Sequence, residues 1–171
     1  MMRYRSGDVA AFEMLYRRHK DPLYRTLLRG CHNEATAAEL FQETWAALIR
    51  TRDAYEVRAK FTTYLYRIAH NKLIDSLRMM RHPTESLGDD SALAAPEHQQ
   101  PENETESAAI GQRVVSSLMQ LPLEQREAFL LKEEGGLSLE EIATATGVGR
   151  ETVKSRLRYA ITKLRQELSD V

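Results

Sequence analysis

Apolar residues in the first half of the chain recur at the three- and four-residue spacing of helices that bury one face. The clearest stripe runs through residues 35–51, and a further helix is predicted over residues 60–81. An earlier helix should begin after Asp8, whose carboxylate can accept the free N–H groups of an opening turn, and its pattern continues beyond Pro22. Residues 1–82 are therefore predicted to form about four helices, with Trp45 on the buried side.

The helical pattern of apolar residues resumes in the last third of the chain, where the ends of the predicted helices are more clearly marked. One helix is predicted to end at Leu121, and the next runs from about Leu123 to Glu134, before a Gly-Gly pair. Ser138 and Glu141 have the spacing of a capping box, in which each residue satisfies an N–H group of the other. A helix is therefore predicted to begin at Ser138.

Residues 83–106 lack a helical apolar period and contain Pro, Gly, Ser, Asn and Gln. They also carry seven acidic residues and no Lys or Arg, whereas residues 1–82 carry fifteen Lys or Arg against nine Asp or Glu. The segment is either a solvated tether or an acidic mimic of nucleic acid for a basic channel of a partner. The predicted fold class is all-α, with two small helical domains (residues 1–82 and 107–171) joined by a flexible acidic linker.

Residues 138–159 have the spacing of a helix-turn-helix, a motif whose second helix enters the major groove of DNA. Ala143 allows close approach of the two helices, and Gly147 suits the left-handed conformation of a tight turn. Lys and Arg on the second helix can neutralise phosphates, and an early Arg or Glu can reach base edges. The predicted DNA-binding residues of this helix are Arg150, Glu151, Thr152, Lys154, Ser155, Arg156 and Arg158.

Other classes of function find little support in the sequence. The five His are scattered, and we interpret His70 as solvated. Cys31 is the lone cysteine, without zinc-ligand spacing around it, and no phosphate-binding loop or nucleophile motif occurs. We therefore expect neither catalysis nor a cofactor or metal. The absence of an apolar leader or spanning stretch predicts a cytoplasmic protein that does not insert into a membrane.

Four segments resemble the motifs of sigma-70 family RNA polymerase sigma factors, in the family's order. SGDVAAFEMLYRRHKDPLYR resembles the opening helix, AELFQETWAALI the polymerase-docking helix, and FTTYLYRIAHNKLIDSLR the promoter-melting helix of region 2. LSLEEIATATGVGRETVKSRLRYAITKLR resembles region 4. Larger members carry further domains between these ends, so the resemblance is to the extracytoplasmic-function (ECF) group. Members usually have another helical turn before the position of Gly7, which predicts that the recorded start is late.

The resemblance implies roles for residues of the first domain. Region 2 would bind the −10 promoter element and hold a base flipped from it, although Tyr55 could equally close the core. The residues implied in this contact are Tyr55, Arg58, Lys60, Tyr64, Arg67, Asn71 and Arg78. Those implied in polymerase binding are Glu39, Leu40, Gln42 and Glu43.

The resemblance also implies partners. They are bacterial core RNA polymerase, contacted at its clamp and flap, promoter DNA with a −35 element read by the helix-turn-helix, and an anti-sigma factor. Two alternatives stay open at this point: a stand-alone dimeric helix-turn-helix regulator, and a sigma-like decoy that binds polymerase without reading promoters.

Overall fold

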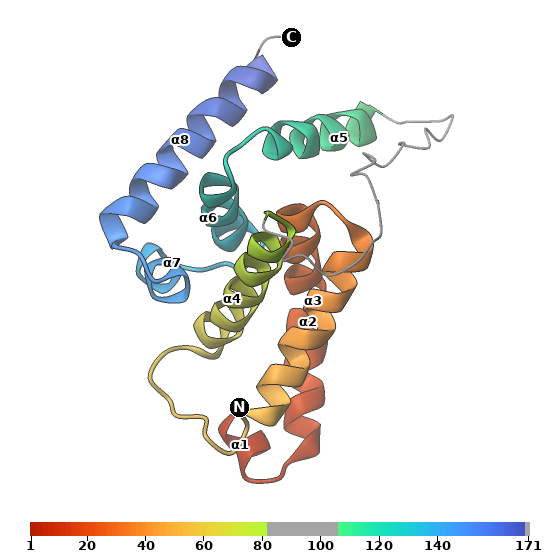
Figure 1. The fold of residues 1–171 in the computed structure, drawn as a ribbon, viewed down its shortest axis with the longest axis vertical. Coiled ribbons are helices and arrows are strands. Elements are labelled where there is room, and N and C mark those ends of the chain that lie inside the picture. Colours follow the sequence, from red (N-terminus) through yellow and green to blue (C-terminus); the bar gives the residue numbers. More distant parts are fainter. Residues whose placement is uncertain (82–105, 170–171) are drawn as a thin grey trace.

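The protein is described by a computed structural model that covers residues 1–81 and 106–169. Over these residues the chain is all-α, as predicted, and the helices are arranged as Figure 1 shows. They are α1 (Met2–Arg5), α2 (Val9–Cys31), α3 (Glu34–Arg50), α4 (Phe61–Arg81), α5 (Glu106–Met119), α6 (Leu123–Glu133), α7 (Leu139–Thr146) and α8 (Arg150–Ser169).

Helix α2 begins and continues as the sequence predicts. The side chain of Asp8 accepts a hydrogen bond from the Ala11 N–H at 3.2 Å, which confirms the cap. Pro22 lies inside the helix, so one main-chain hydrogen bond is lost there. The Thr26 hydroxyl donates to the Pro22 carbonyl at 2.8 Å, and α2 remains one helix of 23 residues.

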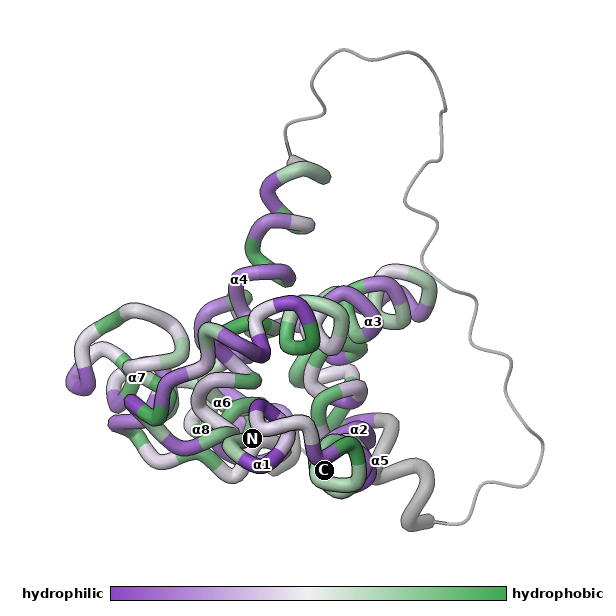
Figure 2. Tube along the Cα trace, turned by 90° about the horizontal axis from the view of Figure 1, so that it is seen from below, coloured by the Kyte–Doolittle hydropathy of each residue, from purple (hydrophilic) through white to green (hydrophobic). Residues whose placement is uncertain are grey.

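Helices α2, α3 and α4 pack together around an apolar core. Trp45 is 5% exposed, which confirms that it belongs to the core. The short helix α1, which the sequence did not predict, adds the buried ring of Tyr4 to the same core. Figure 2 shows hydrophobic and hydrophilic residues interspersed along the helices, as expected for elements with one buried face.

The second half of the chain forms the predicted helix-turn-helix. The Ser138 side chain accepts from the Glu141 N–H at 3.2 Å, and the Glu141 carboxylate accepts from the Ser138 N–H at 2.8 Å, so the capping box is confirmed. Gly147 has a φ of 72°, the left-handed conformation that the turn requires. Val153 and Leu157 of α8 are buried against α6 and α7.

The two halves are in direct contact, which the sequence did not predict. Helix α4 lies beside α7, and α2 lies beside α6. Tyr66 of α4 is 1% exposed, and a Cβ atom built on Gly135 would lie 3.1 Å from its ring. Both halves therefore contribute to one apolar cluster. The predicted linker, residues 83–106, lies outside the described residues except at Glu106, where α5 begins.

Candidate nucleic-acid interface

Helix α8 presents its basic side to solvent, because Val153, Leu157, Ala160 and Leu164 anchor its opposite side in the core. Of the seven side chains predicted to bind DNA on this helix, five are exposed and two are partly buried. The exposed ones are Arg150, Glu151, Thr152, Lys154 and Arg158, and the partly buried ones are Ser155 and Arg156. The structure thus brings the predicted residues to one accessible face.

Arg150, the first residue of α8, is held by carboxylates of its own chain. Its Nε donates to Glu140 at 2.5 Å, and its Nη1 donates to Glu151 at 3.0 Å. The hydrogen bond to Glu140 raises the pKa of Arg150 and lowers the pKa of Glu140. Because α7 supplies Glu140, the ion pair fixes the side chain at the turn between the two helices of the motif.

A second candidate surface is a cavity of about 390 Å³ beside the start of α4. Four of the seven residues predicted to contact the −10 element line it: Tyr55, Arg58, Tyr64 and Arg67. The loop between α3 and α4 supplies the first two, and α4 supplies the others. Aromatic rings and guanidinium groups around a hollow of this size can stack on a base and contact its phosphate.

Contacts among the lining residues hold the wall of this cavity in place. The hydroxyls of Thr51 and Tyr64 are 2.7 Å apart, and the rings of Tyr55 and Tyr64 meet edge to face with centroids 5.1 Å apart. Tyr55 is 5% exposed, so it closes the core and borders the cavity at once. Thr63 Oγ1 is buried beside the cavity without a hydrogen-bond partner among the described residues.

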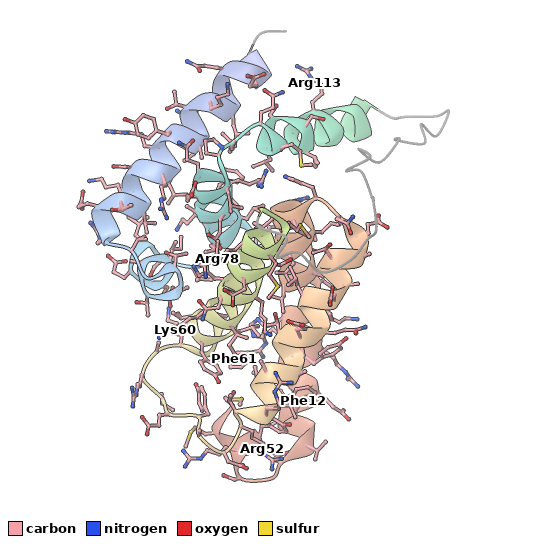
Figure 3. All side chains as sticks on the ribbon, viewed as in Figure 1. Phe12, Arg52, Lys60, Phe61, Arg78 and Arg113 are labelled. Atoms are coloured by element: carbon pink, nitrogen blue, oxygen red, sulfur yellow. The ribbon has the colours of Figure 1, made fainter. Side chains whose placement is uncertain are left out.

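The other three predicted −10 residues lie outside this lining. Lys60 immediately precedes α4, and its Nζ is 3.0 Å from the Glu141 carboxylate of α7. Asn71 and Arg78 are exposed farther along α4, and Figure 3 shows Lys60 and Arg78 at opposite ends of this helix. The cavity and the exposed side of α4 together form one continuous candidate strand-binding surface.

Sequence reasoning missed three threonines that line the cavity: Thr51, Thr63 and Thr144. Thr51, at the C-terminal cap of α3, lines the cavity, and its hydroxyl group contacts that of Tyr64. Thr144 lines it from α7, which belongs to the other half of the chain. No sequence signal identifies Thr144, because its position depends on the packing of α7 against α4.

The predicted polymerase-docking side of α3 is only partly accessible. Glu39 and Gln42 are exposed, and Glu43 is partly buried beside Lys72 at 2.7 Å. Leu40 is 4% exposed and packs in the core, so its side chain lies inside the protein rather than on the docking surface.

The interpretation of His70 as a solvated residue is wrong. Its Nδ1 lies 2.5 Å from the Glu127 carboxylate of α6, and its side chain is 16% exposed. The contact between the two halves, which the sequence did not reveal, is what buries it. Within residues 1–81 and 106–169, no cluster of His, Cys, Asp or Glu has the arrangement of a metal site, and no helix is long and apolar enough to cross a membrane.

Comparison with protein-family models gives two matches. Residues 15–82 match sigma-70 region 2, and residues 111–164 match sigma-70 region 4. The first match includes α4 and the residues that line the candidate cavity, except Thr144. The second includes the helix-turn-helix.

Curated relatives align over nearly the whole chain. The RNA polymerase sigma factor CarQ of Myxococcus xanthus is 32% identical over all of this chain and 97% of its own length. The ECF RNA polymerase sigma factor SigM of Mycobacterium tuberculosis is 32% identical over 93% of this chain and 78% of its own.

Two solved structures share the fold, each with a TM-score of 0.72. One is CnrH in complex with the cytosolic domain of CnrY, at 24% identity over 99% of this chain and 96% of CnrH. The other is the sigma factor RpoE in complex with the anti-sigma factor NepR from Bartonella quintana, at 21% identity over 94% and 98% of the two chains.

Proposed function

The chain belongs to the extracytoplasmic-function group of the sigma-70 family of RNA polymerase sigma factors, and we propose the following roles for its parts in transcription initiation. Residues 1–82 bind core RNA polymerase and open the −10 element, and residues 107–171 read the −35 element. Residues 83–106 connect the two activities. The chain supplies recognition and strand opening, and the polymerase supplies the chemistry.

Reading of the −35 element is assigned to the exposed side of α8. Its Lys and Arg side chains neutralise phosphates, and residues of its first turns reach base edges in the major groove. The support is that Arg150, Lys154 and Arg158 are exposed on one helix whose other side is buried.

The cavity beside α4 is the observation that carries the −10 assignment. Extruding a base costs a few kcal/mol, and a pocket that receives the base offsets part of that cost. Tyr64 and Arg67 supply an aromatic ring and a cation at its edge, and Tyr55 supplies a further ring. Asn71 and Arg78 continue the surface for the single strand that follows.

Polymerase binding is assigned to the exposed acid and amide groups of Glu39 and Gln42, which suit basic residues on the clamp. The second domain would contact the flap. An anti-sigma factor is a further proposed partner, since RpoE of Bartonella quintana was solved in complex with one.

The test is run-off transcription from fragmented genomic DNA with purified bacterial core polymerase, with and without the chain. New transcripts that share two spaced upstream elements are expected. A stand-alone dimeric regulator would instead bind a palindrome without polymerase, and a decoy would bind polymerase without producing new start sites. Either result would contradict the proposal.

Residue assignments are tested on a promoter found in this way. The double variant Arg150→Ala and Lys154→Ala should reduce transcription and leave polymerase binding unchanged, whereas Lys132→Ala, an exposed cation on α6, should change neither. Loss of polymerase binding and transcription together would show that α8 has been assigned wrongly. For the cavity, Arg67→Ala should slow promoter opening without weakening −35 contact.

A further inference from the structure

The short helix α1 lies outside every motif that the proposed function uses. It precedes the opening helix, and the match to sigma-70 region 2 begins only at residue 15. Its side chains nevertheless contact residues 51–60, the segment that joins α3 to α4 and supplies Tyr55 and Arg58 to the candidate cavity. We call residues 51–60 the cavity loop.

Arg5, the last residue of α1, holds the main chain of the cavity loop. Its Nη1 donates a hydrogen bond of 2.8 Å to the carbonyl oxygen of Tyr55, which lies 50 residues away in the sequence. The donor is a charged group, and hydrogen bonds from charged donors are stronger than those between neutral groups. Because the acceptor is a main-chain atom, the bond fixes the loop and leaves the phenol ring of Tyr55 available to border the cavity.

A second contact holds the beginning of the same loop. The guanidinium group of Arg52 lies over the ring of Tyr4, 5.4 Å from its centroid, and Figure 3 shows Arg52 at the end of the molecule where α1 lies. Tyr4 itself is 7% exposed, and its ring is 4.9 Å from that of Phe12. The apolar core therefore fixes α1, and α1 in turn holds the cavity loop at two points.

Packing by itself leaves Tyr55 room to move. Tyr55 borders the candidate cavity and also a second cavity of about 360 Å³, whose lining includes Met2, Met14 and Phe61. A side chain beside a hollow lacks contacts on that side, so few atoms oppose its displacement toward the hollow. The hydrogen bond from Arg5 opposes such a shift, because it keeps the main chain at Tyr55 at one distance from α1.

A shift of the cavity loop would alter the candidate cavity. The rings of Tyr55 and Tyr64 meet edge to face with centroids 5.1 Å apart, and Arg58 follows on the same loop. A base that enters the cavity must meet these groups in one geometry. Displacement of a binding group by about 1 Å is enough to weaken such contacts.

We propose that α1 is a positioning element of the −10 site, in which Arg5 fixes the cavity loop so that Tyr55 and Arg58 are in place before a base enters. The inference rests on the proposed function, because it takes the cavity as the site of the extruded base. Arg5 touches no nucleotide in this role and acts through the carbonyl group of Tyr55. Preorganisation of this kind reduces the cost of ordering the loop on binding, so Arg5 strengthens contact with the base and not with the DNA backbone.

The experiment measures how much the extruded base contributes to binding. The complex of core polymerase with the full chain is titrated with forked promoter DNA, in which the −10 element of the non-template strand is single-stranded. In a series of forks, each nucleotide of this element is replaced in turn by an abasic one. The position at which replacement weakens binding of the wild-type complex most identifies the extruded base. The ratio of the affinities for the intact and the abasic fork at that position is the base preference.

Arg5→Ala should reduce the base preference at least about threefold, the size expected for one hydrogen bond, and leave the affinity for the abasic fork unchanged. Arg5→Lys keeps a cation that can donate to the same carbonyl group, and it should restore most of the preference. Arg3→Ala is the matched control. It removes a cation of the same helix that pairs with Asp8 at 2.7 Å, and its base preference should equal that of the wild-type chain.

A merely structural role for Arg5 would give a different result. Loss of folded chain lowers binding to the intact and the abasic fork by the same factor, so the base preference would stay unchanged. An unchanged preference in Arg5→Ala, or an equal loss in Arg3→Ala, would overturn the positioning role. A preference in Arg5→Lys as low as in Arg5→Ala would overturn the role of the donated hydrogen bond. Wild-type binding that no abasic replacement weakens would instead refute the assignment of the cavity in the proposed function.

Discussion

The guanidinium group of Arg126 donates a hydrogen bond of 3.0 Å to the main-chain carbonyl of Gly30, which lies in the last turn of α2. The last carbonyls of a helix have no partner within it, and the helix dipole leaves partial negative charge there. A cation from α6 therefore caps a helix of the other half. A second hydrogen bond, 3.3 Å to the Met119 carbonyl, connects the same side chain to the end of α5.

Truncation of this side chain should destabilise the folded chain. Arg126→Ala leaves the buried Gly30 carbonyl without this donor, and an unsatisfied buried polar group costs about 1–3 kcal/mol. Thermal unfolding followed by circular dichroism should show a lower midpoint than for Lys132→Ala, an exposed cation on the same helix. Equal midpoints for the two variants would show that the cap contributes nothing to stability.

The close approach at Gly135 should tolerate no side chain. An alanine Cβ there would meet the Leu131 carbonyl oxygen at 2.7 Å, so backbone must shift, at a cost of about 1–3 kcal/mol. Gly136→Ala is the comparison variant. A Cβ atom on Gly136 would point into open space, so the only cost of the alanine is the backbone strain of a φ of 64°. Urea unfolding should rank Gly135→Ala as the less stable variant, and the reverse order would contradict the close packing of Gly135 against Leu131 and Tyr66.

Stability should depend on pH through His32. Burial lowers the pKa of His32 to about 4 in the folded chain, and the positive charge of Arg126 contributes a smaller part of this decrease. An unfolded His titrates near about 6.5, so between these values the unfolded state binds more protons. The free energy of unfolding therefore falls as the pH drops from about 6.5 to about 4, and is fully retained above that window.

His32→Asn should flatten this dependence. His32 has a φ of 61°, and Asn tolerates that left-handed conformation, so the variant removes the titrating group without a new strain. Thermal midpoints of both proteins are compared across the window. Burial also lowers the pKa of His19, so a smaller slope should remain. An unchanged slope would show that His32 is not the group responsible.

The capping box at Ser138 should stabilise the helix-turn-helix. Ser138→Ala removes the side-chain acceptor for the Glu141 N–H, which costs about 1 kcal/mol. Ser116→Ala, an exposed position within α5, should change stability little. Thermal midpoints that are the same for both variants would contradict the role of the cap.

The sequence predicted those features of the fold that depend only on neighbouring residues. The Asp8 cap, the Ser138 capping box and the left-handed Gly147 depend on neighbours within a few residues, and all three are confirmed. His70 and Tyr66 were not placed, because their burial depends on Glu127 and Gly135, which are far away in the sequence. Amphipathic periodicity indicates that a side is buried, but not against which element.

In the candidate site too, residues with a local sequence signal were predicted, and a residue placed by distant packing was not. Tyr64 and Arg67 follow from the motif of the promoter-melting helix, and Tyr55 and Arg58 from the loop that precedes it. All four line one cavity. Thr144 comes from the other half and carries no recognisable signal. The domain boundaries and the roles of the individual site residues stay predictions.

The carboxylate of Glu140 should weaken DNA binding by α8. It accepts from Arg150 at 2.5 Å, so DNA must compete for this guanidinium group, and its negative charge also repels nearby phosphates. Glu140→Gln keeps an acceptor for Arg150 but removes the charge. Affinity of the polymerase-bound chain for DNA should rise several-fold at low salt, and the gain should shrink as added salt screens the charge. Glu13→Gln, an exposed position on α2, is the control for net charge. Unchanged or weaker binding by Glu140→Gln would indicate that Glu140 acts instead by aiming Arg150 at the DNA, and that the ion pair assists recognition.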